Sequence, residues 1–221
     1  MACCRPARKA SRLVTNLSDL LPGPSDRACF VGQTGSGKTT LAEYVCRFRP
    51  YVVVYDAKGT IRWPGYKLVT KLERLQAAAR QSSRIIYRPT YGELHDADIV
   101  DAFFEWVYRR KRTCIYVDEL SAITRGDVYP WHLGACLTRG RELGVVVYAS
   151  TQRPMKIPQV VLSESEHVYN FRLRLPQDRK RMHETTGIHP IRVSELAKQE
   201  FYYIPQDGDP EGPYRLQLPT V

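Results

Sequence analysis

Short apolar runs alternate with longer segments of helical periodicity along most of the chain. Several of these runs are apolar at every position, which is typical of parallel strands covered on both faces. Predicted strands fall at residues 28–31, 51–55, 84–87, 113–117 and 145–149, and predicted helices at 38–48, 71–81, 97–112 and 131–143. Asp96 is placed to cap the third helix. The alternation predicts an α/β fold with a parallel sheet and right-handed crossovers.

The two ends of the chain differ from this pattern. A further strand at 167–175 and a helix at 177–186 are followed by a predicted hairpin, 201–204 with 214–218, whose loop "PQDGDPEGP" is rich in turn residues. Residues 1–26 carry several basic side chains and the helix-breaking stretch "LPGPSD". We therefore expect a basic N-terminal arm at 1–26 and a single domain at 27–221, with a core at 27–185 and a C-terminal extension at 186–221.

The charge of the chain suggests an anionic partner. Its 221 residues carry 33 Lys and Arg against 23 Asp and Glu, a formal net charge of +10, with an ordinary 43% of hydrophobic residues. Such an excess suits nucleic acid first and an anionic membrane surface second. A merely soluble basic protein remains an alternative on charge alone.

The six cysteines do not form a recognisable metal or disulfide pattern. They show no CxxC pair and no ligand spacing with the five histidines, and Cys29 and Cys114 lie inside apolar runs. We interpret them as reduced thiols of a cytoplasmic protein. No apolar run approaches the ~18 residues of a membrane span, and the sequence begins without an apolar signal core.

A glycine-rich segment follows the first predicted strand. The residues "GQTGSGKTT" fit the pattern GxxxxGK[ST], in which backbone N–H groups and a helix N-terminus face a phosphate. Lys38 is expected to reach the β- and γ-phosphates, and the Thr39 hydroxyl to bind Mg²⁺. The predicted nucleotide-binding residues are Gly32, Gln33, Thr34, Gly35, Ser36, Gly37, Lys38, Thr39 and Thr40.

Two carboxylates end the strand "TCIYVDEL". Asp118 is expected to hold Mg²⁺ through water, and Glu119 to orient and deprotonate the attacking water. The adjacent glutamate argues against a GTPase, and no NKxD-like guanine-binding motif is present. The pair therefore favours an ATPase.

The stretch "VVVYASTQRP" ends a buried strand on a polar amide. Two predicted strands separate the phosphate loop from Asp118, as in P-loop ATPases with an additional strand, so strand 145–149 is expected beside the phosphate-loop strand. Gln152 would then contact the attacking water or the γ-phosphate and report hydrolysis. A solvent-facing loop glutamine is the alternative.

Two basic segments remain open to two interpretations each. Arg139 and Arg141, near a helix end, are either a solvated basic face or an arginine finger that reaches a neighbouring subunit's nucleotide. The segment "YDAKGTIRWPGYK" interleaves basic side chains with Trp63 and Tyr66. It either tracks a nucleic-acid backbone or is a surface loop with a tucked tryptophan.

Together these residues resemble the FtsK–HerA superfamily of DNA-pumping ATPases. The resemblance covers about residues 27–185 and rests on "FVGQTGSGKTTL", "VVVYDAKG", "CIYVDEL", "RGRELGVVVYASTQRP" and "VYNFRLRLPQDRKRM", with "TQRP" the most specific element. The chain looks most like the genome-packaging ATPases of membrane-containing icosahedral viruses. This implies a RecA-like P-loop NTPase fold with an additional strand, a central, mainly parallel sheet flanked by helices, and a C-terminal hairpin extension.

The resemblance also implies a mechanism and partners. It implies a homohexameric ring that uses ATP and Mg²⁺ to thread double-stranded DNA, with a possible capsid or vertex protein as partner. The protein would work in the host cytoplasm or the virion. The arginine finger of the family falls on Arg141, with Arg139 second and Arg153 a third candidate.

Three other functions stay open from the residues alone. They are a cellular or plasmid translocase or filamentous-phage assembly ATPase, a nucleotide-switch binding module, and a small-molecule kinase. Glu119, Gln152, the arginine pair and the net charge favour the motor.

Overall fold

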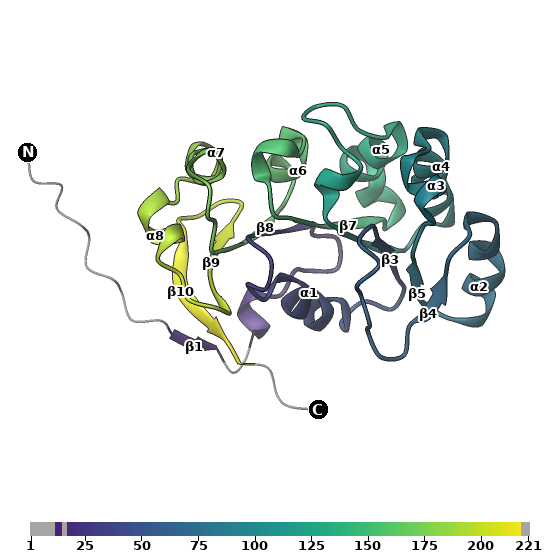
Figure 1. Ribbon diagram of the computed structural model, residues 1–221. Helices are drawn as coiled ribbons and strands as arrows, with labels where there is room; N and C mark the ends of the chain where they lie inside the picture. The colour runs from purple at the N-terminus through teal and green to yellow at the C-terminus, as the bar shows by residue number, and fades with distance from the viewer. Residues whose placement is uncertain (1–11, 15–16, 218–221) are drawn as a thin grey trace, which may run out of the picture.

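A computed structural model describes residues 12–14 and 17–217. Ten strands form one sheet in the order β1-β10-β9-β8-β2-β7-β6-β3-β5-β4 (Figure 1). The strands are β1 (Arg12–Val14), β2 (Ala28–Val31), β3 (Val52–Asp56), β4 (Lys67–Val69), β5 (Arg84–Tyr87), β6 (Cys114–Asp118), β7 (Val146–Thr151), β8 (His167–Phe171), β9 (Glu200–Pro205) and β10 (Glu211–Leu216). The seven strands from β8 to β4 are mutually parallel, as predicted, and β9 and β10 continue the sheet as an antiparallel hairpin.

Helices cover both faces of the sheet (Figure 1). They are α1 (Lys38–Cys46), α2 (Leu75–Gln81), α3 (Tyr91–His95), α4 (Ala97–Arg110), α5 (Trp131–Arg139), α6 (Gln159–Ser163), α7 (Pro176–Thr186) and α8 (Pro190–Ser194). α1 packs on one face, and α4, α5, α6 and α7 pack on the other. No helix in the described ranges is both long and apolar enough to cross a membrane.

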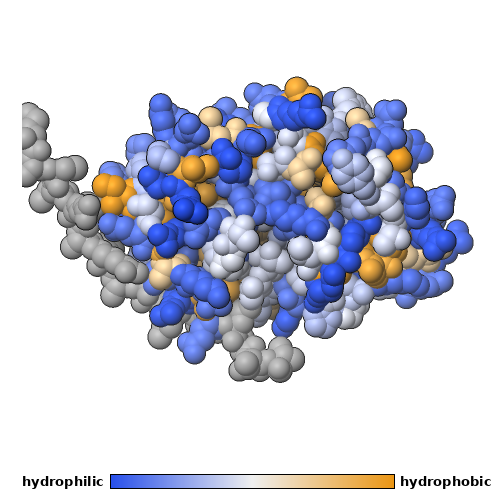
Figure 2. Space-filling model, viewed as in Figure 1, coloured by the Kyte–Doolittle hydropathy of each residue, from blue (hydrophilic) through white to orange (hydrophobic). Residues whose placement is uncertain are grey.

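Alternation along the strands divides the apolar side chains into two cores. In β2, Cys29 and Val31 face the core under α4 and α5, whereas Ala28 and Phe30 face the core under α1. The other central strands divide in the same way, which explains why they are apolar at every position. Hydrophilic side chains dominate the face seen in Figure 2, with apolar ones scattered between them.

Several predicted boundaries agree with the structure to the residue. β2 and β5 span the predicted ranges, and α4 begins after Asp96, whose carboxylate accepts hydrogen bonds from Asp98 N and Ile99 N. The four buried cysteines of the described chain are free thiols, and Cys3 and Cys4 lie outside the described residues.

The sequence pattern missed the shortest elements. β4, α3, α6 and α8 are three to five residues long, too short to show a period. β1 falls within the predicted basic arm and pairs in parallel with β10, and Leu17 and Leu20 are buried in the core under α1. The division of the chain at residue 26 stays a prediction.

The segment 55–67 is better described as a surface loop with a tucked tryptophan than as a nucleic-acid-binding segment. Trp63 is 6% exposed, and its ring stacks on that of Tyr116 at a centroid distance of 5.1 Å. Tyr66 packs edge-on against Trp63, and its hydroxyl accepts a hydrogen bond from Arg84 at 3.0 Å. Neither ring is free to stack on a nucleic-acid base.

Asp56, at the end of β3, fixes this segment. Its fully buried carboxylate accepts hydrogen bonds from Arg88 Nε at 2.9 Å and from the backbone N–H groups of Thr60 and Ile61 at 3.1 and 3.2 Å. Asp56 therefore anchors both the following turn and the neighbouring strand end.

We expect Asp56→Ala to lower the free energy of unfolding by roughly 3 kcal/mol, the low end for a broken buried pair, because Arg88 is partly exposed. Urea unfolding followed by circular dichroism measures the loss. Asp209→Ala, in the exposed hairpin turn, is the control and should change stability by no more than about 0.5 kcal/mol. A loss for Asp56→Ala as small as that of the control would contradict the anchoring role.

Candidate active site

The phosphate loop is a tight turn between β2 and α1 that requires its glycines. Gly32 has φ +156°, and a Cβ there would lie 2.6 Å from the Cβ of Phe171 on β8. Gly37, at the N-cap of α1, has φ +112°. Gly32 N donates to Thr151 O at 3.1 Å and Gln33 N to Arg172 O at 2.8 Å. The loop is thereby held between the ends of β7 and β8.

Lys38 lies inside this loop rather than in solvent. It is 7% exposed, and Nζ donates to Gln33 O at 3.0 Å. Burial lowers the pKa of Lys38 to about 8, although the charge of Glu119 opposes the shift. The ammonium is still mostly protonated at pH 7 and has further donors for a phosphate. Ser36 Oγ is buried with no partner in the described structure, and such an atom suits the same ligand.

The ends of β2, β7 and β6 lie side by side in the sheet, with β7 in the middle. Because these strands are parallel, the phosphate loop, Gln152 and the Asp118-Glu119 pair meet at one edge. This confirms the predicted place of the additional strand. Thr40 is exposed at the third position of α1, directly after Thr39.

Asp118 is 5% exposed and lies opposite Asp56 in the register of β3 and β6. Burial raises the pKa of Asp118; the charge of Lys58 opposes this, and those of Asp56 and Glu119 add to it. Tyr116 Oη donates to its Oδ1 at 3.4 Å. A nearby cation would relieve this crowding of negative charge.

Asp118 and Thr39 offer the kind of oxygen donors that Mg²⁺ prefers. This ion is usually held by one or two carboxylates together with waters and substrate phosphates, and Thr39 occupies the second position of α1, beside the phosphate loop. The donor set therefore fits the ion that the sequence predicts.

Glu119 adopts an unusual backbone conformation for a residue with a side chain. Its φ of +58° and ψ of +70° lie in the left-handed region, at a cost of about 1–2 kcal/mol. Non-glycine residues held in this region cluster at functional sites. The turn ends β6 abruptly and directs the carboxylate toward β7.

Four donors hold the Glu119 carboxylate. Oε1 accepts hydrogen bonds from Ser121 Oγ at 2.5 Å, Thr151 Oγ1 at 3.2 Å and Gln152 N at 3.1 Å, and Oε2 pairs with Lys58 Nζ at 2.7 Å. Burial alone would raise the pKa of Glu119, but the hydrogen bonds from Lys58, Ser121 and Gln152 outweigh it and hold the pKa below its usual value. The carboxylate is therefore ionised and fixed at neutral pH.

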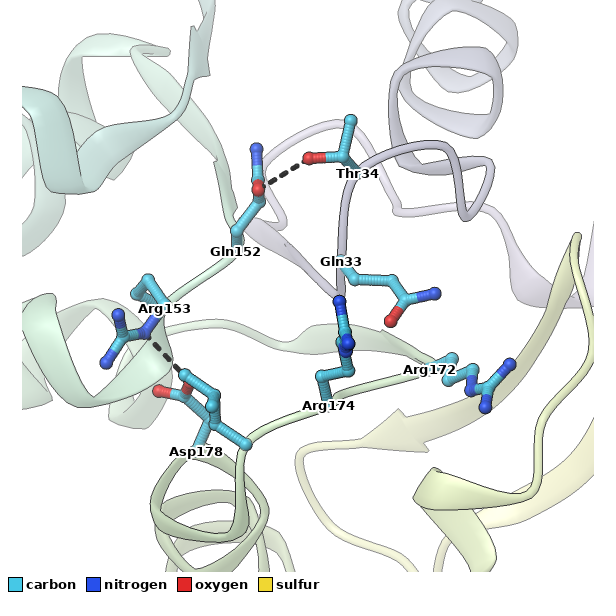
Figure 3. A pocket seen from close by; sticks show the side chains of 8 residues that line it. Gln33, Thr34, Gln152, Arg153, Arg172, Arg174 and Asp178 are labelled. Atoms are coloured by element: carbon cyan, nitrogen blue, oxygen red, sulfur yellow. Dashed lines mark hydrogen bonds and ion pairs between the residues drawn. The ribbon is translucent and has the colours of Figure 1, made fainter.

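The Gln152 side chain contacts the phosphate loop. Thr34 Oγ1 donates to Gln152 Oε1 at 2.7 Å (Figure 3). Through its backbone N–H, Gln152 also contacts Glu119. One residue thus joins the phosphate loop to the Glu119 carboxylate.

A pocket of about 770 Å³ adjoins Gln152 on the side of β8 and α7. We call it the arginine pocket. Its lining residues are Gln33, Thr34, Gln152, Arg153, Arg172, Arg174, Leu175 and Asp178 (Figure 3). Arg153 does not point freely outward, because its Nε pairs with the buried carboxylate of Asp178 at 2.9 Å.

Arg139 and Arg141 lie away from the phosphate loop of their own chain. They are exposed and precede β7, whereas Gln152 follows it, so a strand of about 20 Å separates them. Arg141 Nη1 is 3.8 Å from Glu166, a carboxylate that is already bound by Arg27 at 2.7 Å. The structure therefore brings the phosphate loop, Asp118, Glu119 and Gln152 together, whereas Arg139 and Arg141 lie at the other end of β7.

The sequence analysis did not predict that Lys58 pairs with Glu119, nor that Arg172 and Arg174, which follow β8, line a pocket beside the phosphate loop. The signal for Lys58 was its place two residues after Asp56, at the end of a strand expected near Asp118. The signal for Arg172 and Arg174 was the alternation "FRLRL", which puts both on one side of an extended segment.

Fold and site together define a P-loop NTPase with an additional strand between the phosphate-loop strand and the acidic strand. No protein-family model matches the chain. Over 189 residues it is 23% identical to the DNA packaging ATPase P9 of Enterobacteria phage PRD1, covering 84% of this chain and 79% of P9.

Solved structures share the fold. The genome packaging NTPase B204 of Sulfolobus turreted icosahedral virus 2, in complex with sulfate, superposes with a TM-score of 0.73 at 15% identity, covering 89% of this chain and 100% of B204. B204 has also been solved with AMP, AMPPCP and ATP-γS. VirB4 of Thermoanaerobacter pseudethanolicus gives a TM-score of 0.62 at 9% identity, over 87% of this chain and 90% of VirB4. The chain is thus similar in sequence to one viral packaging ATPase and in fold to another, in agreement with the resemblance found in the sequence.

Lys58→Met should lower kcat for nucleotide hydrolysis by about tenfold to a hundredfold, a part of what a positioned general base contributes. KM should change little, because Lys58 contacts Glu119 rather than the phosphate loop. Steady-state phosphate release measures both constants.

Lys58→Arg should restore much of the rate, since it keeps the charge. Lys67→Met, an exposed lysine at the start of β4, is the control. A rise in KM with unchanged kcat would show that Lys58 binds substrate instead of positioning Glu119.

Proposed function

We propose that the protein is an ATP-hydrolysing motor that translocates double-stranded DNA and packages a viral genome into a preformed capsid. The observation that carries the hydrolysis is the placement of Glu119. Its carboxylate is ionised, fixed by four donors and joined through Gln152 to the phosphate loop. The similarity to packaging ATPases of phage PRD1 and of an archaeal virus supports the role of the motor.

In the proposed reaction the loop N–H groups and Lys38 bind the β- and γ-phosphates. Thr39 and Asp118 would hold Mg²⁺, which neutralises charge on the transferred phosphoryl group when bound. Glu119 accepts a proton from the attacking water, and Gln152 orients that water from the end of β7. Lys58 keeps the base ionised and directed at its target.

The place of Arg139 and Arg141 supports a ring. Arg141 lies about one strand length from the phosphate loop of its own chain, so it is suited to a neighbour's nucleotide. Arg153 is the weaker candidate for a finger, because its guanidinium is engaged by Asp178.

The comparisons favour packaging over the other motors. The sequence match is to a packaging ATPase, and B204 is covered over its whole length.

Duplex DNA should stimulate ATP hydrolysis by the wild-type protein, which a nucleotide switch would not show. The stimulation and the binding should fall steeply with salt and depend little on sequence, because bound phosphates release counterions whatever the bases. Glu119→Gln is the matched control: it should bind ATP and DNA while turnover falls by roughly 10²–10⁴. Hydrolysis indifferent to DNA at every salt concentration would exclude the motor.

A mixing experiment on Arg141 tests whether the subunits form a ring in which this arginine acts on a neighbour's nucleotide. Lys38→Ala chains keep the arginine but lack a working phosphate site, and Arg141→Ala chains keep the site, so mixing them should restore hydrolysis that neither has alone. The trans contribution should be large, since an arginine finger contributes on the order of 10³–10⁵ in rate.

Subunit exchange is verified by fluorescence transfer between labelled chains, and Arg80→Ala on α2 serves as the control substitution. If rings mix and activity does not return, Arg141 does not act across the interface, and Arg139 and then Arg153 take the same test.

A further inference from the structure

The arginine pocket carries more positive charge than its contacts use. Three guanidinium groups line it, and Asp178 is the single carboxylate among the lining residues. Asp178 is committed: Oδ2 pairs with Arg153 Nε at 2.9 Å, and Oδ1 accepts a hydrogen bond from Met155 N at 3.2 Å. The pocket therefore has about two cationic groups in excess.

The excess charge belongs to Arg172 and Arg174. They follow β8, where the buried positions Phe171 and Leu173 alternate with the exposed positions Arg172 and Arg174, so both arginines leave the backbone on its exposed side. No ion pair of either guanidinium occurs among the described residues. Two adjacent cations without a counter-ion repel each other, and a bound anion relieves that repulsion.

The arginine pocket and the phosphate loop share residues and are joined by a backbone hydrogen bond. Gln33 N donates to Arg172 O at 2.8 Å, and Gln33 and Thr34 belong to both the loop and the pocket wall. Gln152 divides the two spaces, since its backbone contacts Glu119 while its side chain lines the pocket. The hydrogen bond from Thr34 to Gln152 lies between the phosphate loop and the pocket.

One further atom narrows the identity of the anion. Gln33 Oε1 is buried without a hydrogen-bond donor in the described structure. A buried acceptor of this kind requires an N–H or O–H group. Inorganic phosphate near neutral pH carries a P–OH group, whereas a phosphodiester of DNA carries none.

We propose that the arginine pocket is a second anion site, which receives the inorganic phosphate released by hydrolysis before it leaves to solvent. Arg172 and Arg174 bind its charged oxygens through planar, charge-assisted hydrogen bonds, and Gln33 accepts from its hydroxyl. The exposed positions of both arginines and of Leu175 leave the pocket open on its far side. This role rests on the proposed function, since only a hydrolase supplies the product.

The test measures binding of phosphate itself. Protein saturated with Mg·ADP, whose loading is verified first, is titrated with radiolabelled inorganic phosphate in equilibrium dialysis. The wild type should bind, and each substitution, Arg172→Gln or Arg174→Gln, should weaken binding on the order of tenfold. Arg80→Gln, an exposed arginine on α2, is the control and should leave phosphate affinity unchanged.

A second titration does not depend on nucleotide. In Lys38→Ala protein the phosphate loop keeps its N–H groups but has lost its ammonium and binds phosphate more weakly, so a further fall in phosphate affinity with Arg172→Gln would be due to the arginine pocket. Sulfate, which has no hydroxyl at neutral pH, should bind more weakly than phosphate. A duplex oligonucleotide provides the comparison with DNA phosphates.

Three results would overturn the proposal. The first is phosphate affinity that is the same in wild type and in both arginine variants. The second is a pocket that binds sulfate as tightly as phosphate. The third is weakened DNA binding in the variants with phosphate binding intact. None of these depends on translocation, so a protein that binds phosphate here but does not respond to DNA would contradict the proposed motor and leave this site standing.

Discussion

Parallel pairing of β2, β7 and β6 is the constraint on which the site depends. Parallel strands end at the same edge, so a glycine turn, an amide and a carboxylate pair distant in sequence become neighbours. The close approach of Gly32 to Phe171 leaves no room for a side chain and sets how near the loop can lie to β8. A slip of one residue in any one of these strands would turn the side chains of that strand to the opposite face and separate its group from the other two.

Three carboxylates are buried near the active site, where little water can stabilise their charges. Asp56, Asp118 and Glu119 are all buried, and the same low-dielectric surroundings that penalise their charges strengthen each contact with a cation. Asp56 pairs with Arg88, and Glu119 pairs with Lys58. Burial raises the pKa of Asp118. Two of the three acidic groups are thus paired within the described chain, and in the proposed function Asp118 would hold Mg²⁺.

The local parts of this arrangement could be predicted from sequence, and the long-range parts could not. The glycine loop, the acidic strand end and Gln152 are contiguous motifs, so their chemistry is written in neighbouring residues. The pair of Lys58 with Glu119 joins residues that are 61 positions apart and depends on the register of β3 against β6. Trp63 was ambiguous for the same reason, because only the position of Tyr116 decides whether its ring is covered. Short elements such as α8 carry too few residues for any periodicity to be visible.

The pairing of β1 with β10 has a consequence for handling the protein. The outermost strand of this side of the sheet comes from the start of the chain, and the strand it covers comes from the end. A shortened version beginning at residue 27, which the motifs alone would suggest, would lose β1 and the buried Leu17 and Leu20 together. It would leave Tyr214–Leu216 of β10 without their partner strand, and an uncovered strand edge of this kind favours edge-to-edge association. If such a fragment were insoluble, the cause would be the missing edge strand of the sheet and not a defect in the nucleotide site.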